Sequence, residues 1–263
     1  MIRDITIGQY YPSASSIHKL DPRTKIIGVF AYIISLFFIE YFVGYAFVAV
    51  SLYALIRVSK VPLSYMLKGL KSIGFILIFT MALNLFFTTE GNEIFSFWIF
   101  KVTDQGILMA IKLGVRLVLL IIGSSLLTLT TSPIELTDGI EMLLKPFSKI
   151  GVPAHEIAMM MSISLRFIPI LIEETDKIMK AQLARGADFE SGNIIKRAKA
   201  MVPILIPLFI SAFRRADELA MAMEARCYRG GVGRTRLKCL KYAKSDMMAF
   251  SIMILFVVIC LML

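Results

Sequence analysis

The sequence predicts an all-α, polytopic membrane protein with about five transmembrane helices and a cytoplasmic layer of long amphipathic helices. Two observations support this prediction. Of the 263 residues, 57% are hydrophobic, and the mean hydropathy of +0.76 is too high for an ordinary soluble domain of this length. In addition, long apolar runs alternate with charged segments, which is typical of membrane spans joined by polar connections.

The first apolar run, residues 26–56, is too long for a single span. As one helix its 31 residues would reach roughly 46 Å, whereas the hydrocarbon core is about 30 Å thick. We therefore predict two short spans that turn near residues 40–44. Asp21 and Pro22 precede the run and are a favourable N-cap and first helical residue, so they are predicted to begin the first helix.

Three further spans are predicted at residues 72–87, 107–130 and 247–263. The fourth span, 107–130, contains Lys112 and Arg116. Lys112 lies near the end of the span, where its side chain can extend to the interface. Arg116 lies deeper, where an unpaired charge is costly, so we expect it either to pair structurally or to lie on a substrate pathway.

The charges of the connecting segments set the orientation in the membrane. The N-terminal segment and residues 57–71 are basic, whereas residues 88–106 are acid-leaning. By the positive-inside rule the N-terminus is cytoplasmic, and five spans then leave the C-terminus extracellular. The predicted organisation is therefore transmembrane helices over residues 1–131, a cytoplasmic helical region over 132–245 and a C-terminal transmembrane helix over 246–263.

The cytoplasmic region is more apolar than a soluble domain. Residues 157–172 and 200–213 are about as hydrophobic as a span, but the first is short and the second contains Pro203 and Pro207. We therefore predict long helices that lie along the interface or dip into it. Residues 133–150 are predicted to form a shorter amphipathic helix of the same kind.

One pattern occurs twice in this region. Residues 181–186 are Ala-Gln-Leu-Ala-Arg-Gly and residues 222–227 are Ala-Met-Glu-Ala-Arg-Cys, so both have the form Ala-x-x-Ala-Arg followed by a small residue. Each copy ends an amphipathic helical segment and presents one long cation beside a patch of small residues, which suits insertion into a socket on another protein. The candidate residues are Ala181, Ala184, Arg185, Gly186, Ala222, Ala225 and Arg226.

An ordinary explanation stays open beside this one. An Arg in the last turn suits the negative end of the helix dipole, and a following Gly accepts the left-handed backbone that often ends a helix. Two copies 41 residues apart (226 minus 185), in a region flanked by membrane spans, favour the binding interpretation.

The sequence gives little support to metal, nucleotide or nucleic-acid binding. The only histidines are His18 and His155, and Cys227, Cys239 and Cys260 have no metal-ligand spacing, so no metal site, disulfide framework or catalytic residue is predicted. The basic, Gly-rich stretch that follows the second motif lacks the Gly-Lys-Ser/Thr of a phosphate loop. Anionic lipid headgroups of the bilayer, and not a nucleic acid, are its expected counterpart.

A self-sufficient secondary membrane transporter remains the alternative. Such a carrier needs a substrate or ion site in mid-membrane, for which Arg116 with Asn84 is the only candidate, and the spans hold too few carboxylates or histidines for a proton relay. A membrane enzyme would need a nucleophile with a base or a metal cluster, and neither is apparent.

The whole chain resembles the transmembrane coupling (T) component of energy-coupling factor (ECF) transporters, a class of ABC importers for vitamins and transition-metal ions. The resemblance rests on the order of the elements, on residues 20–25 (Leu-Asp-Pro-Arg-Thr-Lys) and on the paired Ala-Arg motif. It implies a prokaryotic plasma membrane and two long coupling helices whose tips insert into two ABC ATPase subunits, A and A′. It also implies a separate S component that captures the substrate and rests on these helices.

The resemblance also implies roles for individual residues. Arg185 and Arg226 would seat the ATPases, since a guanidinium offers a fixed fork of donors, and the small residues around them would let the tips fit closely. ATP would be bound by the partner subunits, so the chain itself is expected to need no cofactor and not to be an enzyme. One departure is visible, because Cys227 stands where the family pattern has Gly.

Overall fold

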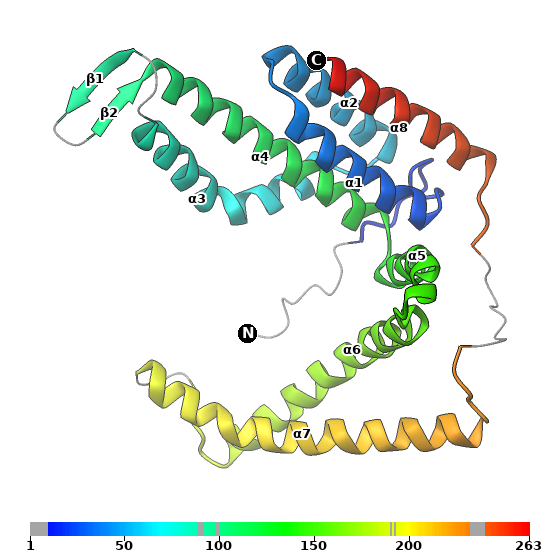
Figure 1. The fold of residues 1–263 in the computed structure, drawn as a ribbon. Helices are drawn as coiled ribbons and strands as arrows, with labels where there is room; N and C mark the ends of the chain where they lie inside the picture. The colour runs from blue at the N-terminus through cyan, green and yellow to red at the C-terminus, as the bar shows by residue number, and fades with distance from the viewer. Residues whose placement is uncertain (1–9, 89–91, 98–99, 190, 192, 232–239) are drawn as a thin grey trace. The chain divides into compact units, whose positions relative to one another are not determined.

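The computed structural model describes residues 10–88, 92–97, 100–189, 191, 193–231 and 240–263 (Figure 1). In chain order the elements are α1 (Pro22–Phe38), α2 (Phe42–Ser59), α3 (Leu63–Phe87), β1 (Glu93–Phe97), β2 (Phe100–Thr103), α4 (Asp104–Thr130), α5 (Pro133–Leu144), the 3₁₀ turn η1 (Lys145–Ile150), α6 (Ala154–Ala184), α7 (Ile194–Ala225) and α8 (Lys244–Met262). They fall into two compact units. The first holds α1 to α4, the strands and α8, the second holds η1, α6 and α7, and the boundary lies within α5.

Helix α4 is the centre of the first unit, because it packs against α1, α2 and α3. Small residues on α4 allow its neighbours to come close. The ring of Tyr32 occupies the space that a Cβ at Gly123 would need, and a Cβ at Gly114 would lie 2.6 Å from the sulfur of Met81. The Tyr32 hydroxyl also donates to the carbonyl of Leu119 at 2.9 Å. Close approach at small residues is a common way for helices to associate in a bilayer.

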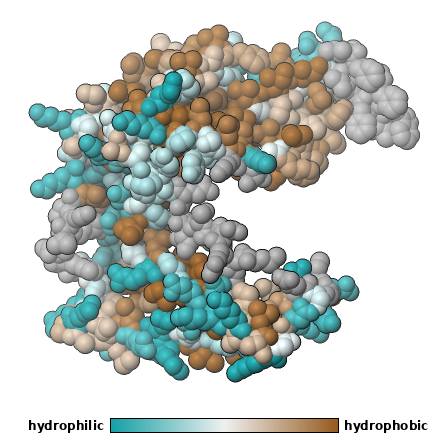
Figure 2. Space-filling view, turned by 180° about the vertical axis from the view of Figure 1, so that it is seen from behind, coloured by the Kyte–Doolittle hydropathy of each residue, from teal (hydrophilic) through white to brown (hydrophobic). Residues whose placement is uncertain are grey.

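The core of the first unit lies where α1, α2 and α4 meet. Leu36, Val48 and Leu129 are almost fully buried there, and Tyr45 and Cys260 join them. Many large apolar side chains on the other faces of these helices are exposed. Figure 2 shows hydrophobic residues over most of the surface of this unit, whereas the surface over α6 and α7 mixes hydrophobic and hydrophilic residues. This distribution fits a unit surrounded by lipid.

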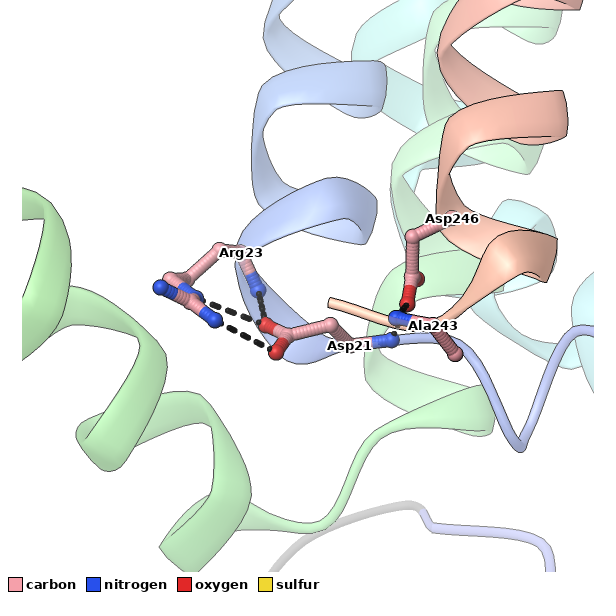
Figure 3. Close-up of polar contacts among 4 residues, drawn as sticks. All are labelled: Asp21, Arg23, Ala243 and Asp246. Carbon is pink, nitrogen blue, oxygen red and sulfur yellow. Dashed lines mark hydrogen bonds and ion pairs between the residues drawn. The ribbon is translucent and has the colours of Figure 1, made fainter. Parts of the chain in front are cut away.

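The first and last helices of this unit begin at one shared carboxylate (Figure 3). Asp246, in the first turn of α8, is 1% exposed, and its two oxygens accept hydrogen bonds from the backbone N–H groups of Asp21 and Ala243, both at 2.8 Å. Asp21 is the N-cap of α1, as predicted, and accepts from the backbone N–H of Arg23. Arg23 also pairs with both oxygens of Asp21 and stacks on the ring of Tyr242. The sequence analysis identifies the N-cap, but not the junction with α8.

Lys25, in the first turn of α1, is a buried residue of the same region. Its Nζ donates to the carbonyl of Thr130 at the end of α4 (2.9 Å) and to the carbonyl of His18 (3.1 Å). The last carbonyls of a helix have no partner within the helix, so the amine satisfies a group at the end of α4 that would otherwise be buried without one.

The second unit consists mainly of two long helices that cross, α6 and α7 (Figure 1). Both contain internal prolines, Pro169 in α6 and Pro203 and Pro207 in α7, and each proline removes one backbone hydrogen bond of its helix. The predicted amphipathic segment at residues 133–150 is α5 followed by η1, and it ends at Gly151 in the left-handed conformation, with φ of +93°.

One connecting segment is shorter than predicted. The sequence predicts a basic loop over residues 57–71, but α2 continues to Ser59 and α3 already begins at Leu63. A left-handed turn at Lys60, with φ of +58°, joins the two helices. The charges mislead here because long cationic side chains are compatible with helix ends at the interface.

The connection between the third and fourth predicted spans contains a β-hairpin that the sequence analysis does not predict. Strands β1 and β2 pair antiparallel, with Glu93 opposite Thr103 and Phe97 opposite Phe100. Each strand has only four or five residues, too few for the alternation of apolar and polar residues to stand out. Apart from this hairpin, the prediction of an all-α polytopic fold is confirmed.

Among the described residues, the number of helices apolar and long enough to cross a membrane agrees with the predicted number of about five spans, but they are not all the predicted helices. Helices α2, α4, α6 and α8 are long and apolar enough to cross a membrane, and α3 is a fifth if its two parts, which meet at 60°, form one span. Helix α1 has 17 residues and reaches roughly 26 Å, slightly less than the hydrocarbon core. Helix α6 is long and apolar enough to cross a membrane, whereas the sequence predicts that it lies along the membrane interface or dips into it.

We expect Asp246→Asn to lower the stability of the protein by about 1–3 kcal/mol. Both carboxylate oxygens accept from backbone N–H groups, in a buried bond from Asp21 and a partly buried one from Ala243, and an amide would turn an NH₂ donor toward one of them. Thermal unfolding in detergent measures the effect. Asp217→Asn, at an exposed position of α7, is the control and should leave the midpoint unchanged; equal midpoints for the two variants would contradict the junction.

The charge of Asp21 should make the stability of the protein depend on pH in the acidic range. Burial alone would raise the pKa of Asp21, but the hydrogen bonds and charge of Arg23 and the charge of Lys25 outweigh it, so the pKa lies below its ordinary value of 3.8. The contribution of the ionised group is present above pH 3.8 and is lost as the pH falls through the lower folded-state pKa. Asp21→Asn keeps an N-cap but removes the charge, so the stability difference between wild type and variant should shrink below this pH. A difference that does not change with pH would contradict the assignment.

Candidate functional site

Helices α6 and α7 end in the same way, and the two ends carry all the residues of the paired motif. Arg185 is the C-cap of α6, and Arg226 is the C-cap of α7. The residue after each Arg has a left-handed backbone, with φ of +87° at Gly186 and +53° at Cys227. Cys227 therefore adopts the conformation that usually favours glycine, and the departure from the family pattern does not change the geometry of the helix end.

Two backbone hydrogen bonds recur at the same positions of the two ends. In each, the residue after the C-cap donates to the carbonyl three positions back, and the next residue donates to the carbonyl five positions back. The pairs are Gly186 to Leu183 (2.9 Å) and Ala187 to Gln182 (3.0 Å) in α6, and Cys227 to Glu224 (2.8 Å) and Tyr228 to Met223 (3.0 Å) in α7. Both ends are Schellman motifs.

Both helix ends, which we call the Arg185 tip (residues 181–186) and the Arg226 tip (residues 222–227), are open to their surroundings. The Ala, Arg, Gly and Cys residues of the motif are exposed in both. Within the part of the chain that the structure describes, no hydrogen bond or ion pair engages the side chain of Arg185 or Arg226. The left-handed residue that the ordinary explanation expects is present at both ends, and the Schellman bonds satisfy carbonyls of each last turn without the Arg side chain. Two exposed cations remain, each with its full set of donors.

The two tips lie at the ends of equal arms. Helices α6 and α7 cross beside an ion pair between Glu174 and Arg215 (3.4 Å), and an apolar groove of about 290 Å³ runs next to the crossing. Arg185 and Arg226 each lie 11 residues beyond the ion pair (185 minus 174 and 226 minus 215), or roughly 16 Å along the helix. The C-terminal ends of α6 and α7 lie apart in Figure 1.

Arg116 has a structural role in α4. Its Nε donates to the hydroxyl of Tyr45 at 3.0 Å, its Nη2 donates to the carbonyl of Ile39 at 3.2 Å, and the rings of Phe37 and Tyr45 lie beside the guanidinium. Ile39 is the C-cap of α1, so Arg116 satisfies a carbonyl at the end of that helix. Asn84 instead donates to the carbonyl of Thr80 within α3. The mid-membrane site that a self-sufficient carrier would need is therefore not formed by Arg116 and Asn84.

Sequence reasoning misses one cluster near the Arg226 tip. The two ring nitrogens of His155 contact Glu141 of α5 and Tyr228, which directly follows Cys227. These three residues are 14 and 73 positions apart in the sequence, and no motif links them. In the described residues no cluster of three or more His, Cys, Asp or Glu is arranged to hold a metal ion.

Comparison with known proteins gives a consistent result over almost the whole chain. The family described as cobalt transport protein (CbiQ) matches residues 13–237. A protein of Clostridium kluyveri named energy-coupling factor transporter transmembrane protein EcfT is 63% identical over 250 residues, which cover 95% of this chain and 93% of the relative. Proteins of the same name from Thermosediminibacter oceani and Bacillus subtilis are 57% and 50% identical, over 95% and 94% of this chain and 94% and 93% of their own lengths.

The left-handed positions of the two tips should respond oppositely to substitution. Cys227→Gly removes a side chain from a left-handed residue and should stabilise the last turn of α7 by about 1 kcal/mol. Gly186→Ala should destabilise the last turn of α6 by about the same amount, for backbone reasons alone, because no atom lies within 4 Å of the added Cβ. Amide hydrogen exchange of the two turns measures both effects; changes of the same sign would contradict the shared geometry.

Proposed function

This chain belongs to the CbiQ family, as an EcfT-type transmembrane component of energy-coupling factor transporters, and from this premise we propose that it is the non-catalytic scaffold that links two ABC ATPase subunits to an S component. In this role it binds no ATP itself and transmits the movement of its partners. The proposed cargo of the complex is a vitamin or another micronutrient, including transition-metal ions.

The observation that carries the proposal is the pair of matched tips. Two helix ends share the same Schellman bonds, the same exposed small residues and a C-cap Arg, and they lie at equal distances from one crossing. Two such tips suit two partners of similar shape, as the A and A′ subunits would be. The fork of the Arg guanidinium can donate to carboxylates and carbonyls of a groove, and the small residues permit close approach of the helix end.

The crossing explains how the tips could transmit movement. When the ATPases close on ATP, the two sockets would shift relative to each other, and the rigid arms seated by Arg185 and Arg226 would carry this shift to the crossing. Beyond the crossing, α7 exposes an apolar stripe that includes Val202, Ile206 and Phe209. An S component that rests on this stripe would be moved with the arms.

The proposed placement is the plasma membrane of a prokaryote, with the N-terminus in the cytoplasm and the C-terminus outside. The basic N-terminal segment supports it through the positive-inside rule. The proposed placement also puts the two tips on the cytoplasmic side, where ATP and the ATPases are found.

The test is co-purification of the tagged chain with the two ATPase subunits of its host. Arg185→Glu and Arg226→Glu should each weaken retention of the ATPases, and the double variant should lose them, because charge reversal opposes a socket built for a cation. The matched controls are Lys177→Glu on α6 and Arg214→Glu on α7, which reverse exposed cations on the same helices away from the tips.

All variants should remain monodisperse, since an exposed charge contributes little to folding. Retention of both ATPases by the double variant would contradict the assignment of the tips. Loss of the ATPases from the two control variants as well would show that total charge, and not the tips, determines binding.

A further inference from the structure

The two tips match in their own geometry but differ in what holds them. At the Arg226 tip, Tyr228 lies one residue past the left-handed Cys227, and its hydroxyl lies 3.2 Å from Nε2 of His155. His155 is the second residue of α6, and its Nδ1 lies 3.1 Å from Oε1 of Glu141 on α5. We call Glu141, His155 and Tyr228 the His155 clasp.

The hydrogen bonds of the clasp can all be satisfied at once. A carboxylate only accepts, so Nδ1 of His155 carries the proton that is donated to Glu141. In the neutral ring Nε2 is then an acceptor, and the Tyr228 hydroxyl donates to it. The side chains of His155 and Glu141 are 26% and 17% exposed, so these bonds are partly shielded from water.

Gly231 adds a steric element to the clasp. A Cβ at this position would lie 2.5 Å from Cδ2 and 2.7 Å from Cγ of His155. The chain after the Arg226 tip therefore passes directly against the imidazole ring, and only a residue without a side chain fits there. The tip is thus held by Tyr228 through a hydrogen bond and by Gly231 through close contact.

Among the residues that the structure describes, the Arg185 tip has no counterpart of this clasp. The position that corresponds to Tyr228 is Ala187 (228 minus 41), which has no polar side chain. Two hydrogen bonds in the described part of the following connection are local: the N–H of Ser191 donates to Asp188, and Nε of Arg197 donates to the carbonyl of Phe189. These bonds link residues no more than eight positions apart, whereas the clasp joins residues 73 positions apart.

We infer that the His155 clasp is a positioning device that fixes the Arg226 tip to the start of α6, and that the Arg185 tip is the more compliant of the two. The arms are equal in length, so the clasp makes the difference between them. This has a consequence that rests on the proposed function: the two ATPase subunits act on tips that are held with unequal rigidity. Movement of the Arg226 tip displaces the start of α6 directly, and movement of the Arg185 tip acts through its own arm.

The inference can be tested on the purified full-length chain with a nitroxide spin label. Cys227 is exposed and Cys260 is buried, so Cys239→Ser leaves Cys227 as the labelling site. In the same background, Cys227→Gly with Gly186→Cys moves the label to the corresponding residue of the Arg185 tip. We expect the label at position 227 to be less mobile than the label at position 186.

Removal of the Tyr228 hydroxyl separates the clasp from general stability. Tyr228→Phe and His155→Ala should raise the mobility of the label at position 227 to that at position 186, and leave the label at position 186 unchanged. Tyr53→Phe, at an exposed tyrosine of α2, is the control and should change neither label. Equal mobility of the two labels in the parent protein, or an equal rise of both in Tyr228→Phe, would overturn the inference.

The consequence for transport is measured separately, in the complete transporter. Tyr228→Phe should retain both ATPases and lower the amount of substrate taken up per ATP hydrolysed. Unchanged uptake per ATP, together with a more mobile label, would limit the clasp to a structural role. It would contradict the proposed mechanical difference between the two tips. The label experiment needs no ATPase, so failure of the ATPase-binding proposal would leave its result intact.

Discussion

One buried carboxylate, that of Asp246, joins the first and last helices of the first unit. Its two oxygens accept from the backbone of Asp21 before α1 and of Ala243 before α8, residues more than 220 positions apart. Backbone donors at a helix start have no partner within the helix, and burying them unpaired costs free energy. The carboxylate satisfies two such starts at once, and it thereby fixes where α8 begins relative to α1.

The same constraint accounts for two cations of this unit, the buried Lys25 and the half-buried Arg116. Arg116 donates to the carbonyl of Ile39 where α1 ends, and Lys25 donates to the carbonyl of Thr130 where α4 ends. A charge in an apolar environment is tolerated when it is hydrogen-bonded. These charges therefore act between helix ends, and Arg116 in particular is part of the packing of α1 and α4 with Tyr45 and not of a mid-membrane site.

The tips of α6 and α7 represent the opposite case. Carbonyls of their last turns are satisfied by the backbone, through Schellman bonds, and the side chains of Arg185 and Arg226 are exposed. The local sequence predicts this arrangement because a Schellman motif depends on a few neighbouring residues. It does not predict that Cys227 would adopt the left-handed conformation of Gly186, since the preference of the side chain is opposed by the hydrogen bonds of the turn.

The sequence by itself determined the helical character, the apolar runs, the N-cap at Asp21 and the paired tips, because each depends on periodicity or on residues close together in the chain. Only the tertiary structure decided the distant partners of Asp246, Arg116 and His155, because the bonds to Asp21, Ile39 and Tyr228 join residues 225, 77 and 73 positions apart. It also decided that the hairpin of β1 and β2 forms, since two strands this short depend on pairing with each other. Helix ends and helical periodicity depend on neighbouring residues and can be predicted from the sequence, whereas pairing between distant groups depends on how the helices pack.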